Sequence, residues 1–137
     1  MKKILSVMAI TAFFISISCS QTTGHADGKK EGAAIEFEAR EHDYGTIARG
    51  GDGTYEFIFR NAGKEPLVLK NVRTSCGCTV PEWPKEPILK GEKGKIKVSY
   101  NTRITGTFSK SVTVYSNAGD KPVVLVIKGK VESAEKQ

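Results

Sequence analysis

Residues 54–60 read TYEFIFR, and this stretch decides the fold of the chain. In an extended strand successive side chains point to opposite faces, so Tyr55, Phe57 and Phe59 share one face. Glu56 and Arg60 fall on the other face. Three aromatic side chains opposite charged ones predict a β-strand that buries one face and exposes the other.

The same two-residue period recurs beyond the first 34 residues, where no stretch shows the 3.6-residue period of a helix. Residues 95–100 and 111–114 alternate apolar and polar side chains in this way. Residues 123–127 are apolar at every position, which predicts a strand covered on both faces, inside the sandwich. We expect about seven strands, at residues 35–39, 54–60, 67–72, around Thr79, and at 95–100, 111–114 and 123–127.

Clusters of glycine, asparagine and aspartate separate these segments, as at residues 49–53, 61–64, 91–94 and 117–120. Glycine and asparagine tolerate the positive φ of tight turns. Short strands at this spacing predict an all-β fold, an immunoglobulin-like antiparallel β-sandwich over residues 35–132, with a polar tail at residues 133–137. Periodicity alone leaves a small barrel as an alternative.

Residues 1–18 have the pattern of a bacterial signal peptide, with a basic start at Lys2 and Lys3 and an uncharged run at residues 4–17. Such a run rises only about 21 Å as a helix, which is short of the ~30 Å core of a bilayer. The cysteine that follows, Cys19, resembles the lipobox of bacterial lipoproteins. We expect the signal to be removed and Cys19 to carry diacylglycerol and acyl chains such as palmitate, which together anchor a protein stably. The alternative is that Cys19 belongs to an ordinary signal.

Residues 19–34 begin with this lipidation site and continue as a polar, glycine-containing stretch, which predicts a flexible tether. His25 lies in the tether, so we do not expect it to be a ligand. No acidic residue directly follows Cys19. This favours an anchor that faces the periplasm, in the outer rather than the inner membrane.

Charge and motifs exclude several classes of function. The net charge of +6 falls to about +4 without Lys2 and Lys3, which is too mild to indicate nucleic acid binding. The sequence has no glycine-rich phosphate loop, no nucleophile elbow and no paired histidines and carboxylates at ligand spacing. We therefore expect neither an enzyme nor a bound cofactor.

The motif Cys76-Gly77-Cys78 carries the remaining thiol chemistry. A bond between the cysteines closes a three-residue loop, which stabilises a fold by only about 1.6 kcal/mol before strain is subtracted. Gly77 allows the tight bend that this bond requires. A structural disulfide or packed thiol pair is one interpretation, and an exchangeable disulfide is a second. Cu(I), which prefers soft ligands at low coordination, is a third, whereas zinc needs two further ligands that the sequence barely offers.

Two other side chains are candidates for a role beside this motif. His42 stands beside Asp43, where a local hydrogen bond is a simpler expectation than metal binding. Trp83 lies in residues 81–87, which contain three prolines. We expect a stiff loop in which the ring caps the sandwich or faces a partner.

Several segments resemble the family called domain of unknown function 1573, namely HDYGTI at residues 42–47, FIFRNAG at 57–63, PL at 66–67 and SCGCT at 75–79. Residues 96–101, 106–108 and 114–117 are similar to its second half, so the resemblance covers residues 35–131. Tyr44 stands where the family more often has phenylalanine, a difference that keeps the aromatic packing. The family is common in lipoproteins and secreted proteins of Bacteroidota. The resemblance implies a sandwich akin to the domains of abnormal-spindle, sperm-surface and hydin proteins, which serve mainly as binding modules, and it implies no established activity.

These features predict a non-enzymatic, lipid-anchored cell-envelope module that binds an unknown protein or envelope polymer through sheet edges and loops. The alternative is a Cu(I)-binding or thiol–disulfide protein that acts through Cys76 and Cys78.

Overall fold

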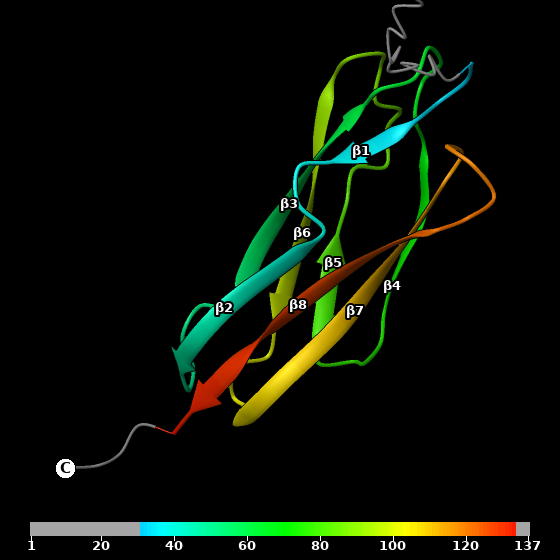
Figure 1. Cartoon of the computed structure of the whole chain (residues 1–137). Coiled ribbons are helices and arrows are strands. Elements are labelled where there is room, and N and C mark those ends of the chain that lie inside the picture. The colour runs from blue at the N-terminus through cyan, green and yellow to red at the C-terminus, as the bar shows by residue number, and fades with distance from the viewer. Residues whose placement is uncertain (1–30, 134–137) are drawn as a thin grey trace, which may run out of the picture.

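The computed structural model describes residues 31–133, and this part of the chain forms two four-stranded β-sheets (Figure 1). It contains no helix that is long and apolar enough to cross a bilayer. The strands are β1 (Ile35–Phe37), β2 (Glu41–Ala48), β3 (Thr54–Asn61), β4 (Leu69–Thr74), β5 (Thr79–Glu82), β6 (Lys93–Tyr100), β7 (Gly106–Ser116) and β8 (Val123–Glu132). Sheet A has the order β1-β3-β6-β5, and sheet B has the order β2-β8-β7-β4. The predicted all-β sandwich is confirmed, and the barrel alternative is wrong because the strands form two separate sheets.

The core lies between the inner faces of the two sheets. Its most deeply buried side chains come from both of them and include Phe57, Phe59, Ile96, Leu125 and Ile127. The rings of Tyr100 in β6 and Phe108 in β7 stack at a centroid distance of 3.8 Å, which joins sheet A to sheet B. Burial of one large apolar side chain contributes about 1.5–3 kcal/mol, so these inward rows hold the sandwich together.

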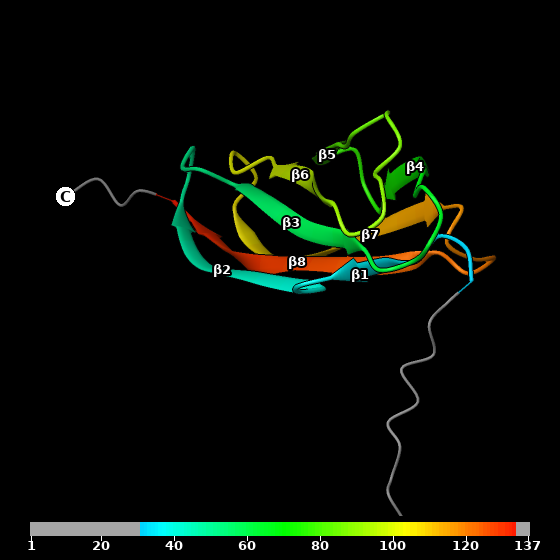
Figure 2. The same ribbon diagram turned by 90° about the horizontal axis from the view of Figure 1, so that it is seen from above.

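The chain crosses from one sheet to the other at both sides of the sandwich. β1 and β2 are consecutive in the chain and lie at edges of different sheets, and the same holds for β4 and β5. β4 and β5 lie side by side in both views (Figures 1 and 2). Residues 38–40 and 75–78 are therefore short connections that carry the chain from the edge of one sheet to the edge of the other.

The structure has eight strands, one more than the sequence predicts, and the additional strand is β2. β2 runs parallel to β8, and its register shifts between Asp43 and Thr46. Gly45 lies inside this bulge with a φ of 64°, in the left-handed region that favours glycine. The bulge breaks the two-residue period, so the hydrophobic pattern of β2 does not stand out in the sequence.

The prediction that residues 123–127 are covered on both faces is wrong. β8 does lie inside sheet B, between β2 and β7, and it buries Leu125 and Ile127. Its other face is open, because Val124 is 49% exposed and Val126 is only half-buried. The continuous apolar run therefore marks an uncovered apolar sheet face.

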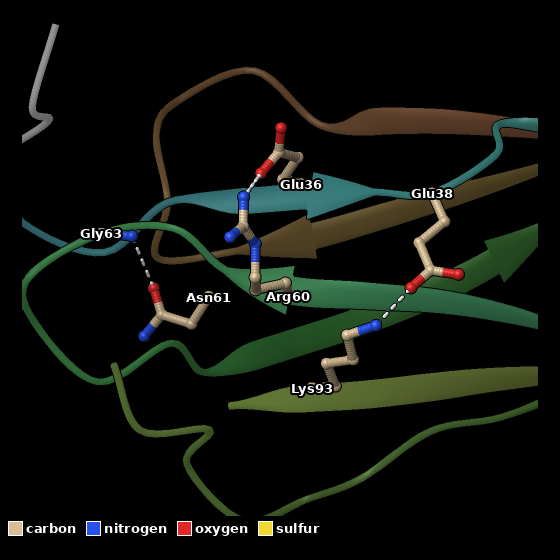
Figure 3. A network of polar contacts seen from close by, with 6 residues as sticks. All are labelled: Glu36, Glu38, Arg60, Asn61, Gly63 and Lys93. Carbon is tan, nitrogen blue, oxygen red and sulfur yellow. Dashed lines mark hydrogen bonds and ion pairs between the residues drawn. The ribbon is translucent and has the colours of Figure 1, made fainter. Parts of the chain in front are cut away.

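Asn61, at the end of β3, is a buried polar side chain that ties three connections together, and Figure 3 shows its contact with Gly63. Its Nδ2 donates to the carbonyl oxygens of Glu65 and Ile88, at 2.7 and 2.9 Å. Its Oδ1 accepts from the backbone N–H groups of Gly63 and Ala34, at 3.0 and 3.4 Å. The amide thus supplies hydrogen-bond partners to backbone groups just before β1, in the turn after β3 and in the loop before β6.

The substitution Asn61→Ala should lower the free energy of unfolding by about 3 kcal/mol, because it leaves buried backbone groups without partners. Asn117→Ala is the matched control. Asn117 is exposed and also bonds two backbone groups, accepting from Val68 N at 2.8 Å and donating to Pro66 O at 3.0 Å. Water can replace those bonds, so we expect a loss of about 1 kcal/mol there. Urea unfolding measures both losses, and equal values would contradict the importance of burial.

Candidate functional site

The two cysteines lie at the connection between β4 and β5, which we call the cysteine corner (residues 75–78). The structure joins Cys76 and Cys78 by a disulfide, with their Cα atoms 5.3 Å apart. Both side chains are half-buried, Gly77 is exposed, and Cys78 packs against the core. The pair therefore sits at the surface, at the point where the chain leaves sheet B for sheet A.

Hydrogen bonds hold the cysteine corner in place without the disulfide. Thr74 Oγ1 lies 2.9 Å from Cys76 O and 3.1 Å from Thr79 O, and its single proton is shared between these two carbonyl oxygens. Ser75 N donates to Ser111 O at 3.0 Å, and Asn101 N donates to Cys78 O at 2.8 Å. Backbone and hydroxyl groups thus fix both ends of the corner to neighbouring strands.

Thr79 contributes a polar group to this site that the sequence interpretation did not include. The residue is 3% exposed. Its hydroxyl oxygen lies 3.8 Å from Cys76 Sγ and 4.0 Å from Cys78 Sγ. A hydroxyl can donate to sulfur, so it faces the atoms on which charge would develop if the disulfide were reduced. The signal in the sequence is a threonine that directly follows the motif.

Gly77 does not need to be glycine for the observed backbone. Its φ lies outside the left-handed region, and a Cβ added there would meet no atom outside residues 76–78 within 4 Å. The sequence predicts only that Gly77 allows a tight bend, and the observed φ does not use the extra freedom of glycine. The bend is formed by a backbone that other residues can adopt, and the space above Gly77 is open.

The candidate metal ligands do not come together in one place. Within residues 31–133, no group of three His, Cys, Asp or Glu side chains could hold a metal ion. His42 is in β2, at the edge of sheet B opposite to β4 and the cysteine corner. Reduced Cys76 and Cys78 could supply two sulfur ligands without it, a set that suits Cu(I) better than zinc.

His42 packs against aromatic rings, where we expected a local hydrogen bond. Its ring stacks on that of Tyr55, with centroids 3.6 Å apart and planes 8° from parallel. Burial lowers the pKa of His42, while the nearby charge of Asp43 acts in the opposite direction. The hydrogen bond to the Asp43 side chain comes instead from the backbone N–H of Gly45, at 2.8 Å.

Trp83 follows β5 and packs partly against the core, as the capping alternative predicts. The ammonium group of Lys85 lies 3.1 Å from the centroid of the indole ring. The indole Nε1 is buried and has no hydrogen-bond partner among the described residues. A shallow groove of about 590 Å³ runs past Trp83, Pro84 and Ile88. The role of Trp83 as a partner contact stays a prediction.

The outer faces of the two sheets differ in chemistry over part of their area, since sheet B carries two ion pairs, Lys128–Glu41 and Lys130–Glu132, in β8 and β2. Sheet A carries four ion pairs on its outer face, Arg60–Glu36, Lys93–Glu38, Lys95–Glu56 and Lys97–Glu82. Figure 3 shows the first two of them. Part of the outer face of sheet B, which we call the open face, consists instead of Arg73, Ser111, Thr113, Tyr115, Val124 and Val126.

The strand registers place the residues of the open face next to one another. Thr113 lies between Arg73 of β4 and Val124 of β8, and Ser111 is opposite Val126. Tyr115 is 37% exposed, and the Arg73 guanidinium lies 5.9 Å from its ring centroid. Arg73 has no ion-pair partner among residues 31–133. The open face therefore combines apolar, hydroxyl and cationic groups. No other element of the described domain packs over them.

Cys19 lies outside the described residues, so the structure does not bear on its lipidation. The sequence model of one family, described as "Protein of unknown function (DUF1573)", matches residues 35–131. No curated protein is significantly similar to the chain in sequence.

Several solved structures have a similar fold. A protein of unknown function from Porphyromonas gingivalis W83 has a TM-score of 0.66 and 15% identity, over 79% of this chain and 51% of that one. The ASH/PapD-like domain 7 of human CEP192 has a TM-score of 0.62 and 9% identity, over 95% and 100%. The secreted serine protease VesC of Vibrio cholerae has a TM-score of 0.58 and 14% identity, over 75% of this chain and 24% of that one. The chain spans about half of the Porphyromonas protein and a quarter of the protease, and the likeness concerns the immunoglobulin-like fold alone.

Tyr44 of β2 lies on the side of the sandwich between β2 and β3, and it makes the stability of the fold depend on pH. Its hydroxyl donates to Gly53 O at 2.8 Å. Burial, and then the charges of Asp52 and Tyr55, raise the pKa of Tyr44 to about 12. Because the pKa is higher in the folded than in the unfolded protein, the contribution of Tyr44 is complete below about pH 10, the ordinary tyrosine pKa, and is lost as the pH rises to about 12.

We expect the urea midpoint of the wild-type protein to fall from pH 10 to 12 more steeply than that of Tyr44→Phe. The titration of lysines and other tyrosines is common to both proteins, so the difference isolates Tyr44. At pH 7 the variant should lose about 1 kcal/mol, because the hydrogen bond to Gly53 is absent. Parallel pH profiles would show that Tyr44 ionises equally well in the folded state.

Proposed function

The chain belongs to the family of proteins of unknown function called DUF1573, and from this premise we propose that it is a non-enzymatic binding module that a lipid on Cys19 holds at the bacterial cell envelope. The observation that carries the proposal is the open face of sheet B. Exposed valine and tyrosine lie beside an arginine that has no ion-pair partner among residues 31–133. Such a surface is of the kind that protein interfaces use, since tyrosine and arginine are enriched at their centres.

The partner that fits this surface is an extended segment of another envelope protein, with apolar side chains and a carboxylate. Apolar side chains would lie on Val124 and Val126, and the carboxylate would pair with Arg73. An envelope polymer is the other partner that the sequence suggests, but the apolar centre of the open face favours a protein.

The edge strand β4 supports this mode of binding. β4 borders the open face, and its regular pairing with β7 runs from Asn71 to Thr74. A new strand can add to such an edge through backbone hydrogen bonds. The other edges suit this less well: β1 has three residues, β2 contains a bulge, and β5 is short and contains Pro81.

A photo-reactive amino acid at position 115, in the full-length protein in its native envelope, should form a covalent adduct with a specific partner. The same probe at Lys95, on the outer face of sheet A, should not. Val124→Glu should reduce the adduct at least tenfold, because it buries a charge in the apolar centre. Val80→Glu is the matched control, since Val80 is 59% exposed on β5 of sheet A.

Urea unfolding must show that both valine variants keep their folded stability. Adducts of equal yield from both sheets, or an adduct that survives Val124→Glu, would contradict binding at the open face. An adduct with a second copy of this chain would replace the proposed partner by self-association.

Lipid anchoring predicts a mature protein that begins at Cys19 and partitions into the detergent phase of an aqueous two-phase separation. Intact mass should show the added acyl chains. Cys19→Ala should move the protein to the aqueous phase, with the unfolding midpoint of the domain unchanged. Membrane association that survives this substitution would contradict a lipid on Cys19.

A further inference from the structure

The geometry of the cysteine corner points to a second activity, and we propose that the Cys76–Cys78 disulfide oxidises a cysteine pair of another protein. This proposal is independent of binding at the open face. Three features of the corner carry it: a bond with little structural value, open access above Gly77, and a buried hydroxyl that faces both sulfur atoms.

The disulfide contributes little to holding the fold. Closing a three-residue loop stabilises a protein by only about 1.6 kcal/mol. The hydrogen bonds of Thr74, Ser75 and Asn101 already fix the corner to β5, β7 and the end of β6. The reduced protein should therefore keep its fold, as a protein that cycles between dithiol and disulfide must.

The backbone that carries the bond is exposed to solvent at Gly77. No atom outside residues 76–78 lies within 4 Å of the point where its Cβ would stand. Glycine is not required there by backbone conformation, so the absence of a side chain leaves room for an approaching thiol. Cys78 packs against the core whereas Cys76 does not, which makes Cys76 Sγ the sulfur that a partner reaches.

The hydroxyl of Thr79 stabilises the sulfur that leaves as a thiolate. A partner thiolate attacks Cys76 Sγ, the Cys76–Cys78 bond breaks, and a mixed disulfide forms at Cys76. Cys78 leaves as a thiolate and accepts a hydrogen bond from Thr79 Oγ1, which lies 4.0 Å from Cys78 Sγ in the disulfide form. The thiolate then takes a proton from water. A stabilised leaving thiolate speeds exchange. Thr79 is therefore a positioning residue for this reaction.

A second thiolate of the partner completes the reaction by attacking the sulfur that it shares with Cys76. The partner disulfide forms, Cys76 leaves as a thiolate, and the pair ends as a dithiol. The partner loses two electrons and the cysteine pair gains two, so one turnover requires no other oxidant.

The test uses the full-length lipidated protein in detergent and a synthetic peptide with two cysteines that can form a disulfide with each other. Intact mass after acid quenching follows the oxidised peptide and the reduced protein. We expect exchange at least tenfold faster than the exchange of the same peptide with oxidised glutathione. Reduction should leave the unfolding midpoint nearly unchanged.

Two pairs of variants separate the chemistry from the fold. Thr79→Val should slow exchange about tenfold and raise the midpoint pH for alkylation of the reduced protein by about one unit, whereas Thr79→Ser should keep wild-type behaviour. Gly77→Phe should strongly slow reduction of the disulfide by the peptide but only slightly slow its reduction by dithiothreitol. Gly77→Ala should change neither rate. Lys95→Ala, on the outer face of sheet A, should not change any of these rates.

Three results would overturn the proposal. The first is a disulfide that the peptide reduces no faster than it reduces oxidised glutathione. The second is a protein that unfolds on reduction, which would make the bond structural. The third is stoichiometric Cu(I) binding by the reduced protein, in competition with a chelator, together with slow exchange, which would make Cys76 and Cys78 a copper site.

Discussion

The constraint on which the rest of the structure depends is that the strands lining the core bury one face only. Phe57 and Phe59 on sheet A and Leu125 and Ile127 on sheet B fill the space between the sheets. Since successive side chains alternate, the residues between them must point to solvent. The inner faces are alike in chemistry, so the differences that matter for function lie on the outer faces and in the connections.

The outer faces have diverged in a way that packing does not require. Exposed ion pairs such as Lys95–Glu56 contribute about 0–1 kcal/mol each, so the charged outer face of sheet A adds little to stability. Its charges keep the sheet soluble and discourage association. The open face of sheet B lacks this protection around Val124 and Tyr115. An uncovered apolar surface has a cost in solubility, and a binding role gives it a reason.

The connections carry the polar chemistry because there the backbone leaves both hydrogen-bonded ladders. Side chains must then satisfy the groups that strands would otherwise pair. Asn61 does this at the turn after β3, and Thr74 does it at the cysteine corner. The same corner holds Cys76 and Cys78, so their disulfide sits on a connection that hydrogen bonds already fix to the neighbouring strands.

The sequence by itself determined the all-β class, the inward face of β3 and the cysteine motif, because these features depend on a two-residue period and on residue identity. It did not reveal β2, whose bulge and parallel pairing interrupt that period, and it suggested a covered strand where Val124 is exposed. Only the tertiary structure decided that His42 lies across the sandwich from the cysteines and that the Thr79 hydroxyl faces both sulfur atoms. The physical reason is that periodicity determines which face of a strand a side chain lies on. The order of the strands and the connections between the sheets determine which residues that side chain contacts.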